Sequence, residues 1–440
     1  MLSRWKWVVV RFSRRLWVRA SLFALVGILT ALAAIVLAPF LPLDWANKIG
    51  ADAVGNILDI LASSMLVVAT FSLSTMVAAY NAAAAGTTPR VVQLLVADTR
   101  AQNAIATFIG GFLFSLVGII ALSSEIYGPS GRIVLFFVTI VVAGFIVLTF
   151  IRSIDYVLRL GRVADAIERV AVAAVKAMND RHDHPWLGVR AQQGPSLAKH
   201  AIVPSGIGYV TYLDMAALEE VAQRTGTEIQ VAALPGAFVD PSRPLAWTTV
   251  ALDEAGSREV EQAFSLGSSR SFDQDPRFGV VVLAEIASKA LSPGVNDPGT
   301  AIGVITTLVR VLATWTRPAS PSEIRFPHVV VPTIAVDELF DDAFTAVGQD
   351  AAGSLTVGIK LQKALVTLAA LGRHDFREAA RHQSRLALAR AGRKLVLPED
   401  VDQLAAVAGL LANDDVPAGP AAAGHAAPAG CSRHSARQDP

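Results

Sequence analysis

Residues 133–151 read IVLFFVTIVVAGFIVLTFI, a run without a single charged side chain. Its length is close to the ~20 residues that an α-helix needs to cross the ~30 Å hydrocarbon core of a bilayer. Similar apolar runs occupy residues 20–42, 57–79 and 102–122, and Asp59 is the only charged residue inside them. We expect no further span after residue 151. The sequence therefore predicts an α-helical membrane protein, with four transmembrane helices followed by a mixed α/β cytoplasmic domain.

The distribution of Lys and Arg predicts the orientation of these helices. Basic residues gather before the first run, between the second and third runs, and just after the fourth: Arg4, Lys6, Arg11, Arg14, Arg15, Arg19, Arg90, Arg100, Arg152, Arg159 and Arg162. The opposite loops carry little beyond Lys48 and Arg132. Because basic loops close to membrane spans stay on the cytoplasmic side, we expect a multi-pass protein of the bacterial inner membrane with both termini in the cytoplasm.

The first apolar run has a second interpretation, as part of a signal peptide covering residues 1–42. A basic start followed by an apolar stretch is typical of both. The stretch is longer than the ~7–15 apolar residues of a signal peptide core. Trp5, Trp7 and Trp17 also stand where aromatic side chains anchor a helix at the membrane surface. These two observations favour a retained membrane span.

Periodicity and composition divide the chain into six segments. Apolar positions at helical spacing continue from residue 152 to about 180, short β-like runs begin near 200, and the end is rich in Ala, Pro and Gly. The expected segments are a basic cytoplasmic N-terminal arm at 1–19, a four-helix transmembrane domain at 20–151, a connecting helix and loop at 152–199, a small β-rich module at 200–250, a mainly helical cytoplasmic domain at 251–414, and a disordered tail at 415–440.

Charge and cysteine content limit the partners. The formal net charge is +1, whereas a nucleic-acid-binding domain usually presents a strongly basic face, so we expect no nucleic acid partner. The single cysteine, Cys431, rules out an internal disulfide framework or a multi-cysteine metal site. We expect no cofactor and no metal. The expected partners are the lipid bilayer and other copies of the same chain.

The second apolar run differs from the others because it carries many polar residues. With ~100° of rotation per residue, five of them fall on one face of the helix: Asp59, Ser63, Thr70, Ser74 and Asn81. A carboxylate facing lipid is unfavourable by at least ~2.5 kcal/mol at the helix centre. We therefore expect this face to contact protein or water. It either packs against other helices, with hydroxyls bonded across the bundle or to their own backbone, or lines a polar path.

Two blocks beyond the membrane runs are distinctive. They are DQDPRFG at residues 273–279 and ALSPGVNDPGTA at residues 290–301. With these blocks and the four apolar runs, nearly the whole chain resembles a bacterial family of predicted membrane proteins catalogued as domain of unknown function 2254. Relatives often have a bulky residue where this chain has Gly299. The resemblance implies a membrane location and no particular activity.

Both blocks contain an Asp-Pro pair at an expected helix start. Asp is a preferred N-cap, and Pro is favoured at the first helical position, so Asp275 and Asp297 are expected to begin two helices. Two such starts could bring their amides together on an anion, with charge from Arg270, Arg277 and Lys289. Alternatively, both are rigid corners of a helical domain. The candidate loop or ligand-binding residues are Asp273, Asp275, Arg277, Ser292, Asn296, Asp297 and Thr300.

Three functional classes can be ranked from these features. The polar face of the second run favours an oligomeric ion channel or transporter with a cytoplasmic domain. The alternative is a membrane-anchored sensor or scaffold whose cytoplasmic domain binds a ligand or a protein partner. An enzyme ranks last, because no combination of base, nucleophile and orienting group is visible, and we assign no catalytic residue.

Overall fold

The computed structural model describes residues 51–123, 129–183, 189–191, 198–317 and 324–411, with isolated positions between residues 18 and 33. The expected N-terminal arm, first span and disordered tail therefore lie essentially outside the described residues. The chain divides into two compact units, residues 1–170 and residues 171–440. We call them the membrane unit and the α/β unit, and each is described by itself.

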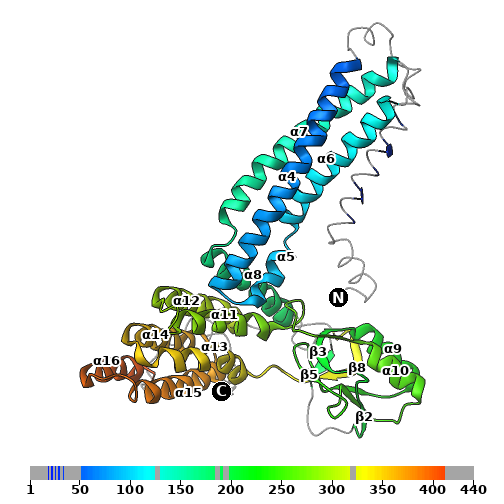
Figure 1. Ribbon diagram of the computed structural model, residues 1–440. Helices are drawn as coiled ribbons and strands as arrows, with labels where there is room; N and C mark the ends of the chain where they lie inside the picture. Colours follow the sequence, from blue (N-terminus) through cyan, green and yellow to red (C-terminus); the bar gives the residue numbers. More distant parts are fainter. Residues whose placement is uncertain are drawn as a thin grey trace, which may run out of the picture. The chain divides into compact units, whose positions relative to one another are not determined.

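Three long apolar helices form the membrane unit. They are α4 (Ala51–Gly86), α6 (Thr99–Ser123) and α7 (Pro129–Arg159), which lie side by side in Figure 1. Leu58, Met65 and Phe108 are buried between them. Small residues allow the close approach: a Cβ added at Gly111 would lie 2.6 Å from Ile146 Cδ1. The short helices η2 (Pro89–Val91) and α5 (Val92–Val96) connect α4 to α6.

Four helices among the described residues are long and apolar enough to cross a membrane. Three of them, Ala53–Gly86, Thr99–Ser123 and Ile133–Ile154, agree with the second, third and fourth expected spans. The other is Pro298–Thr316, which follows residue 151, where no further helix of this length and composition was expected. Its Val304, Ile305 and Leu308 are fully buried in the α/β unit. One face of this helix therefore packs in a protein core, and 33% of its apolar window is buried.

The helix expected to continue from the fourth span to about residue 180 is interrupted. Helix α7 ends at Arg159, and α8 begins at Val163 and ends at Asp183. Gly161 lies between them with φ of +85°, a conformation that residues with a side chain rarely adopt. Periodicity on both sides of Gly161 is helical, so the pattern alone did not reveal the break.

Two small sheets lie in the α/β unit. The five-stranded sheet has the order β1-β8-β4-β6-β2, and the three-stranded sheet has the order β5-β3-β7. The strands are β1 (Val189–Ala191), β2 (His200–Ile202), β3 (Gly208–Leu213), β4 (Ile229–Val231), β5 (Phe238–Val239), β6 (Ala246–Thr248), β7 (Phe264–Gly267) and β8 (Phe326–Val331). Strands β7 and β8 follow residue 250, so both sheets include chain from beyond the expected β-rich module.

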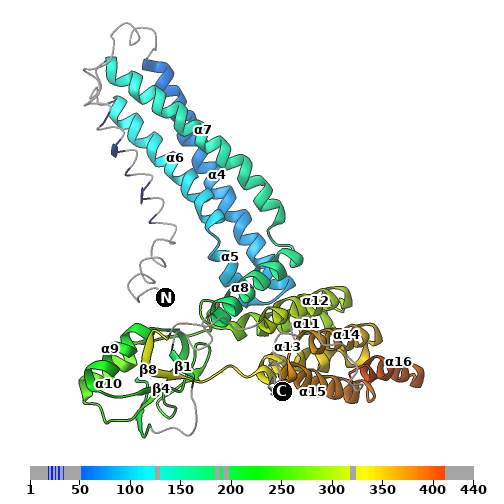
Figure 2. The same cartoon turned by 180° about the vertical axis from the view of Figure 1, so that it is seen from behind.

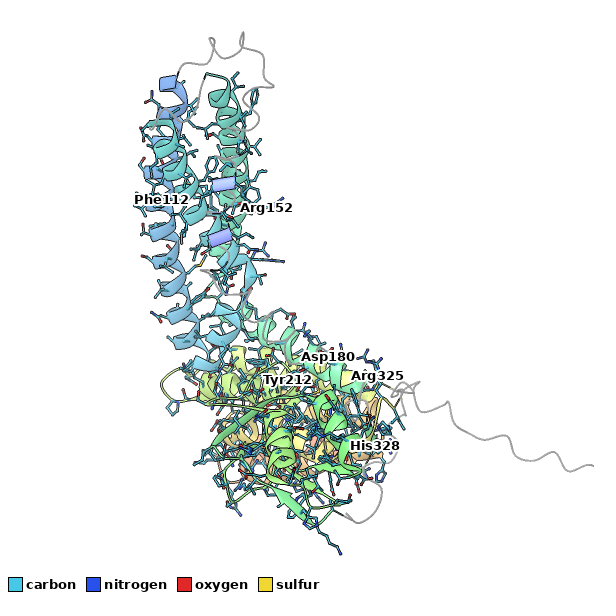
Figure 3. All side chains as sticks on the ribbon, turned by 90° about the vertical axis from the view of Figure 1, so that its right-hand side faces the viewer. Phe112, Arg152, Asp180, Tyr212, Arg325 and His328 are labelled. Atoms are coloured by element: carbon cyan, nitrogen blue, oxygen red, sulfur yellow. The ribbon has the colours of Figure 1, made fainter. Side chains whose placement is uncertain are left out.

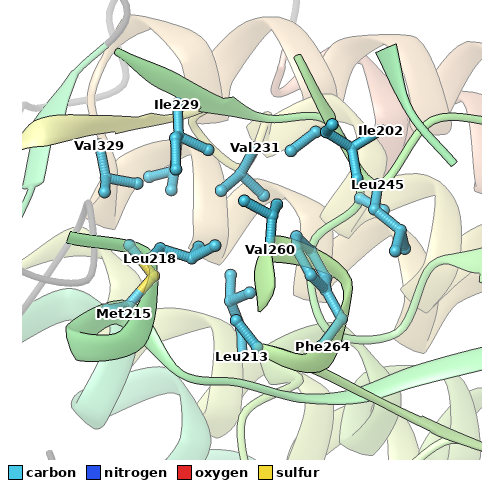
Figure 4. Close-up of a cluster of buried hydrophobic side chains, with 14 of the residues drawn as sticks. Ile202, Leu213, Met215, Leu218, Ile229, Val231, Leu245, Val260, Phe264 and Val329 are labelled. Carbon is cyan, nitrogen blue, oxygen red and sulfur yellow. The ribbon is translucent and has the colours of Figure 1, made fainter. Parts of the chain in front are cut away.

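The two sheets enclose one apolar core with two helices, α9 (Met215–Thr225) and α10 (Glu254–Gln262). Figure 4 shows Leu218 of α9, Val260 of α10 and Ile229 of β4 pointing into this core. Asp214 caps α9 through the amides of Ala216 and Ala217.

The rest of the α/β unit is helical, as Figure 2 shows. Its elements are α11 (Pro276–Leu291), α12 (Pro298–Ala313), η3 (Thr314–Thr316), α13 (Val336–Asp350), η4 (Ala351–Gly353), α14 (Leu355–Leu371), α15 (His374–Ala391) and α16 (Pro398–Gly409). Phe340, Phe344 and Phe376 are fully buried and pack ring against ring. The aromatic cluster therefore holds α13 against α15.

Candidate ligand site at the start of helix α11

Asp275 organises the start of α11. Its Oδ1 accepts hydrogen bonds from the backbone amides of Arg277 and Phe278, both at 3.1 Å, which satisfies two amides that have no partner inside the helix. Arg270 binds the same carboxylate with two bonds, from Nε to Oδ2 at 2.7 Å and from Nη2 to Oδ1 at 3.0 Å. Such a paired contact fixes the guanidinium in orientation as well as in position.

The environment of Asp275 is dry, with only 2% of its side chain exposed. Burial raises the pKa of Asp275 above its ordinary value, although the bonds from Arg270 and the two amides act in the opposite direction. The guanidinium of Arg270 also lies 5.2 Å from the centre of the Phe278 ring. Carboxylate, guanidinium and ring therefore form one packed group.

A tight turn covers Asp275 from the side of the three-stranded sheet. Gly236 has φ of +96°, and its amide donates to the carbonyl of Val210 on β3 at 2.8 Å. A Cβ at this position would lie 2.2 Å from Asp275 Oδ2. Gln274 adds a second link to the sheet, because its Oε1 accepts from the amide of Leu213 at 2.9 Å.

Arg277 connects the start of α11 to α13. Its Nε donates to Asp342 Oδ2 at 2.6 Å, and a terminal nitrogen pairs with Glu338. Arg277 is thus engaged by carboxylates, as Arg270 is.

A third arginine, Arg181, completes the group from the last turn of α8. It is 4% exposed. One terminal nitrogen donates a long 3.4 Å bond to the carbonyl of Pro332, and Nε has no hydrogen-bond partner among the described residues. No carboxylate pairs with Arg181 in the described part of the chain.

These residues surround a cavity of about 250 Å³. Its wall is built from four segments: the end of α8, the turn at 234–237, the stretch 270–277, and the chain from 333 to 338. Arg181, Arg270, Arg277, Asp275 and Glu338 supply its charged groups. Within the described part of the chain, the cavity therefore combines fixed ion pairs with a buried cation, Arg181, that has no carboxylate partner.

The two expected helix starts do not come together on one ligand. Asp297 does cap α12: it accepts from the Thr300 amide at 3.0 Å and from the Thr300 hydroxyl at 2.6 Å, and these bonds lower its pKa. However, α11 separates Asp275 from Asp297, and a helix of 16 residues is about 24 Å long. The hypothesis that the two helix starts bring their amides together on one anion is therefore wrong.

The other candidate loop residues lie away from the cavity. Asp273 is exposed and bonds Ser271 in a local turn. Ser292 ends α11 and donates to the carbonyl of Lys289 at 2.7 Å. Asn296 adopts φ of +49°, and its loop is tied to α11 by the Asp297 amide, which donates to the Ala290 carbonyl at 2.8 Å. Among the candidates, the structure brings only Asp275 and Arg277 to the cavity.

The polar face of α4 is exposed in the membrane unit at all five expected positions: Asp59, Ser63, Thr70, Ser74 and Asn81. The hydroxyls of Ser63 and Thr70 donate to the carbonyls of Asp59 and Leu66, both at 2.8 Å. The apolar face of α4 is the one that packs against the described helices. The hydroxyls of Ser63 and Thr70 therefore bond to the backbone of their own helix and not across the bundle.

Asp98 organises a polar cluster in the membrane unit that no pattern in the sequence indicated. It lies between α5 and α6 and accepts hydrogen bonds from the Tyr156 hydroxyl at 3.0 Å, from Arg169, and from the Arg100 amide at 2.8 Å. Burial alone would raise the pKa of Asp98, but these bonds outweigh it and the pKa is lowered.

Exposed Arg152 on α7, labelled in Figure 3, belongs to the basic stretch that follows the fourth span.

No group of three or more His, Cys, Asp or Glu side chains is placed to hold a metal ion in the described ranges. The groups that the cavity at α11 presents to a ligand are guanidinium groups, carboxylates and apolar side chains.

Comparison with known proteins agrees with the membrane architecture. A family model described as "Predicted membrane protein (DUF2254)" matches residues 13–367. Uncharacterised proteins of Mycobacterium bovis and Mycobacterium tuberculosis are each 23% identical over 288 residues, which is 62% of this chain and 54% of theirs. The chain thus spans about half the length of the curated relatives it matches. No solved structure matches it.

Proposed function

We propose that this chain, which belongs to the DUF2254 family of predicted membrane proteins, is a membrane-anchored receptor whose α/β unit binds a small charged ligand. The observation that carries the proposal is the cavity at the start of α11, with the buried Arg181 in its wall, which no described carboxylate pairs with. Drug-sized ligands usually occupy about 300–1,000 Å³. A cavity of about 250 Å³ suits a smaller molecule.

The arrangement of the cavity walls favours the interpretation as a selective binding site over that as a random packing defect. Arg270 is fixed by Asp275, and Arg277 by Asp342, so these cations are already oriented before a ligand enters. Groups held in place by their own partners lose little freedom on binding. A receptor of this kind needs no catalytic residue.

We expect small ions to stabilise the full-length protein, and expect a rim substitution to remove the effect. Thr333 is exposed and lines the cavity, so Thr333→Trp should block it without disturbing the core. Asp337→Trp is the matched control, because Asp337 is exposed nearby and does not line the cavity. The measurement is the thermal unfolding midpoint in detergent with separate additions of propionate, phosphate, glycine and ammonium. A response that is absent for every addition, or equal in both variants, would exclude the receptor function.

We further propose that the α/β unit lies in the cytoplasm of a bacterial cell and that the protein sits in the inner membrane. The support is the gathering of Arg90, Arg100, Arg152 and Arg162 at one set of loops. In a protein with Cys431 replaced, a cysteine at Ser130 should react with an impermeant thiol reagent on intact cells, and one at Ser205 should not. Labelling at Ser205 would reverse the orientation.

Ion conduction by an oligomer is a second candidate, favoured by the exposed polar face of α4. A polar face that is left uncovered within the described bundle is available to a second copy or to water. Asp59→Asn should then change ion flux through reconstituted vesicles while leaving folding intact, and Ser74→Leu should block it. Flux no greater than that of empty vesicles, with loss of the oligomer in Ser74→Leu, would instead assign this face to helix packing.

A further inference from the structure

We propose that the ligand of the α11 cavity is a small carboxylate with a single negative charge and a short apolar body, held by Arg181. The proposal rests on the receptor function above and specifies its ligand. Three features of the site support it: the balance of charges, the planar shape of the Arg181 guanidinium, and the apolar side chains in the cavity wall.

The charge balance leaves one cation to be neutralised. Arg270 is paired with Asp275, and Arg277 is paired with Asp342 and Glu338. Arg181, which is 4% exposed, has no carboxylate partner in the described ranges. A buried charge without a partner is strongly unfavourable, and the carbonyls at the end of α8 offset it only in part. A single negative charge would complete the site.

Arg181 remains charged under ordinary conditions. Burial lowers its pKa to about 10, which still leaves the guanidinium protonated at neutral pH. A guanidinium is planar and presents parallel N–H groups that match the two oxygens of a carboxylate. A spherical halide can lie between two such N–H groups but does not offer each of them a separate, aligned acceptor, so the shape of the cation favours a planar anion.

Apolar side chains form a further part of the wall, next to the polar Gln274 and Thr333, and suit a short carbon chain. Leu234, Pro235, Ala237 and Ile334 line the cavity beside the arginines. A doubly charged phosphate or sulfate would place excess negative charge close to Asp275 and Glu338, which line the same space. Repulsion from these carboxylates disfavours a dianion. A carboxylate group facing Arg181, with its carbon chain against the apolar wall, satisfies both halves of the site.

The direct test is calorimetric titration of the full-length protein in detergent with propionate, phosphate and chloride at constant ionic strength. Propionate should bind most tightly. Arg181→Gln should weaken propionate binding by about tenfold or more, because it removes the charge and retains polar character. Arg243→Gln, at an exposed site outside the cavity, is the matched control and should bind propionate as the unmodified protein does.

A second measurement needs no ligand. Because Arg181 has no counter-ion among the described residues, Arg181→Met should leave the unfolding midpoint of the ligand-free protein unchanged or raised, whereas Arg270→Met should lower it by leaving Asp275 buried and unpaired. Phosphate binding more tightly than propionate, or Arg181→Gln binding propionate normally, would overturn the carboxylate while leaving the receptor function intact. Equal destabilisation by Arg181→Met and Arg270→Met would show that Arg181 is already neutralised. No binding of any ion, in this titration or in the rim experiment, would remove the receptor function itself.

Discussion

Gly236→Ala is expected to destabilise the α/β unit by about 3 kcal/mol or more, since backbone strain and overpacking act at the same position. The glycine has φ of +96°, and an added Cβ would lie 2.2 Å from Asp275 Oδ2 and 2.6 Å from its Cγ. The carboxylate cannot easily retreat, because it is held by Arg270 and by two backbone amides. Relief of the clash must therefore disturb either the turn or the cap of α11.

Gly226→Ala provides the matched control for this effect. Gly226 also has a positive φ, of +64°, where it ends α9, but nothing lies within 4 Å of an added Cβ. Only the backbone strain of about 1–2 kcal/mol applies there. Hydrogen exchange in the full-length protein measures both changes locally, in β3 and α11 for Gly236→Ala and in α9 and β4 for Gly226→Ala. Equal effects of the two substitutions would mean that the turn does not press on Asp275.

Two glycines in neighbouring helices are expected to respond to alanine with opposite signs. At Gly279 of α11 an added Cβ would lie 2.4 Å from the Cβ and 2.9 Å from the Cα of Ala174 on α8, so the two helix backbones must separate. We expect Gly279→Ala to cost about 1–3 kcal/mol. At Gly303 of α12 nothing lies within 4 Å, and alanine should stabilise the helix by about 0.4–1 kcal/mol through loss of freedom in the unfolded chain.

The measurement for this pair is again hydrogen exchange, followed in α8 and α11 for Gly279→Ala and in α12 for Gly303→Ala. Faster exchange in the first variant and slower exchange in the second is the expected result. Stabilisation by both substitutions would contradict the close contact between α8 and α11.

Local signals in the sequence were sufficient for the helix starts. Asp275 and Asp297 each cap the helix that the sequence placed after them, because a cap involves only residues two or three positions apart. The apolar runs at 57–79, 102–122 and 133–151 were equally clear, since length and composition define a membrane span.

The site was only partly predictable from the sequence, because the environment of Arg181 is formed by residues far away in the chain. Near the end of an amphipathic helix, an arginine normally remains in solvent, and no local pattern indicates that this one is buried. It bonds the carbonyl of Pro332 and shares a cavity wall with the turn at Gly236, and both lie far away in sequence. Short strands such as β7 were missed for a related reason: they are defined by pairing with β3 rather than by their own residues.

The strand order of the larger sheet bears on how the chain folds as it is synthesised. Strand β8 lies between β1 and β4 and pairs with both in parallel, yet it follows α11 and α12 in the chain. One edge of β4 must therefore wait unpaired until residue 331 has left the ribosome. Pairing over such long separations is slow, and an unpaired strand edge is a site of association with other chains. The α/β unit should consequently gain most of its cooperativity only late in translation, and a chain truncated before β8 should be recovered with chaperones or in aggregates.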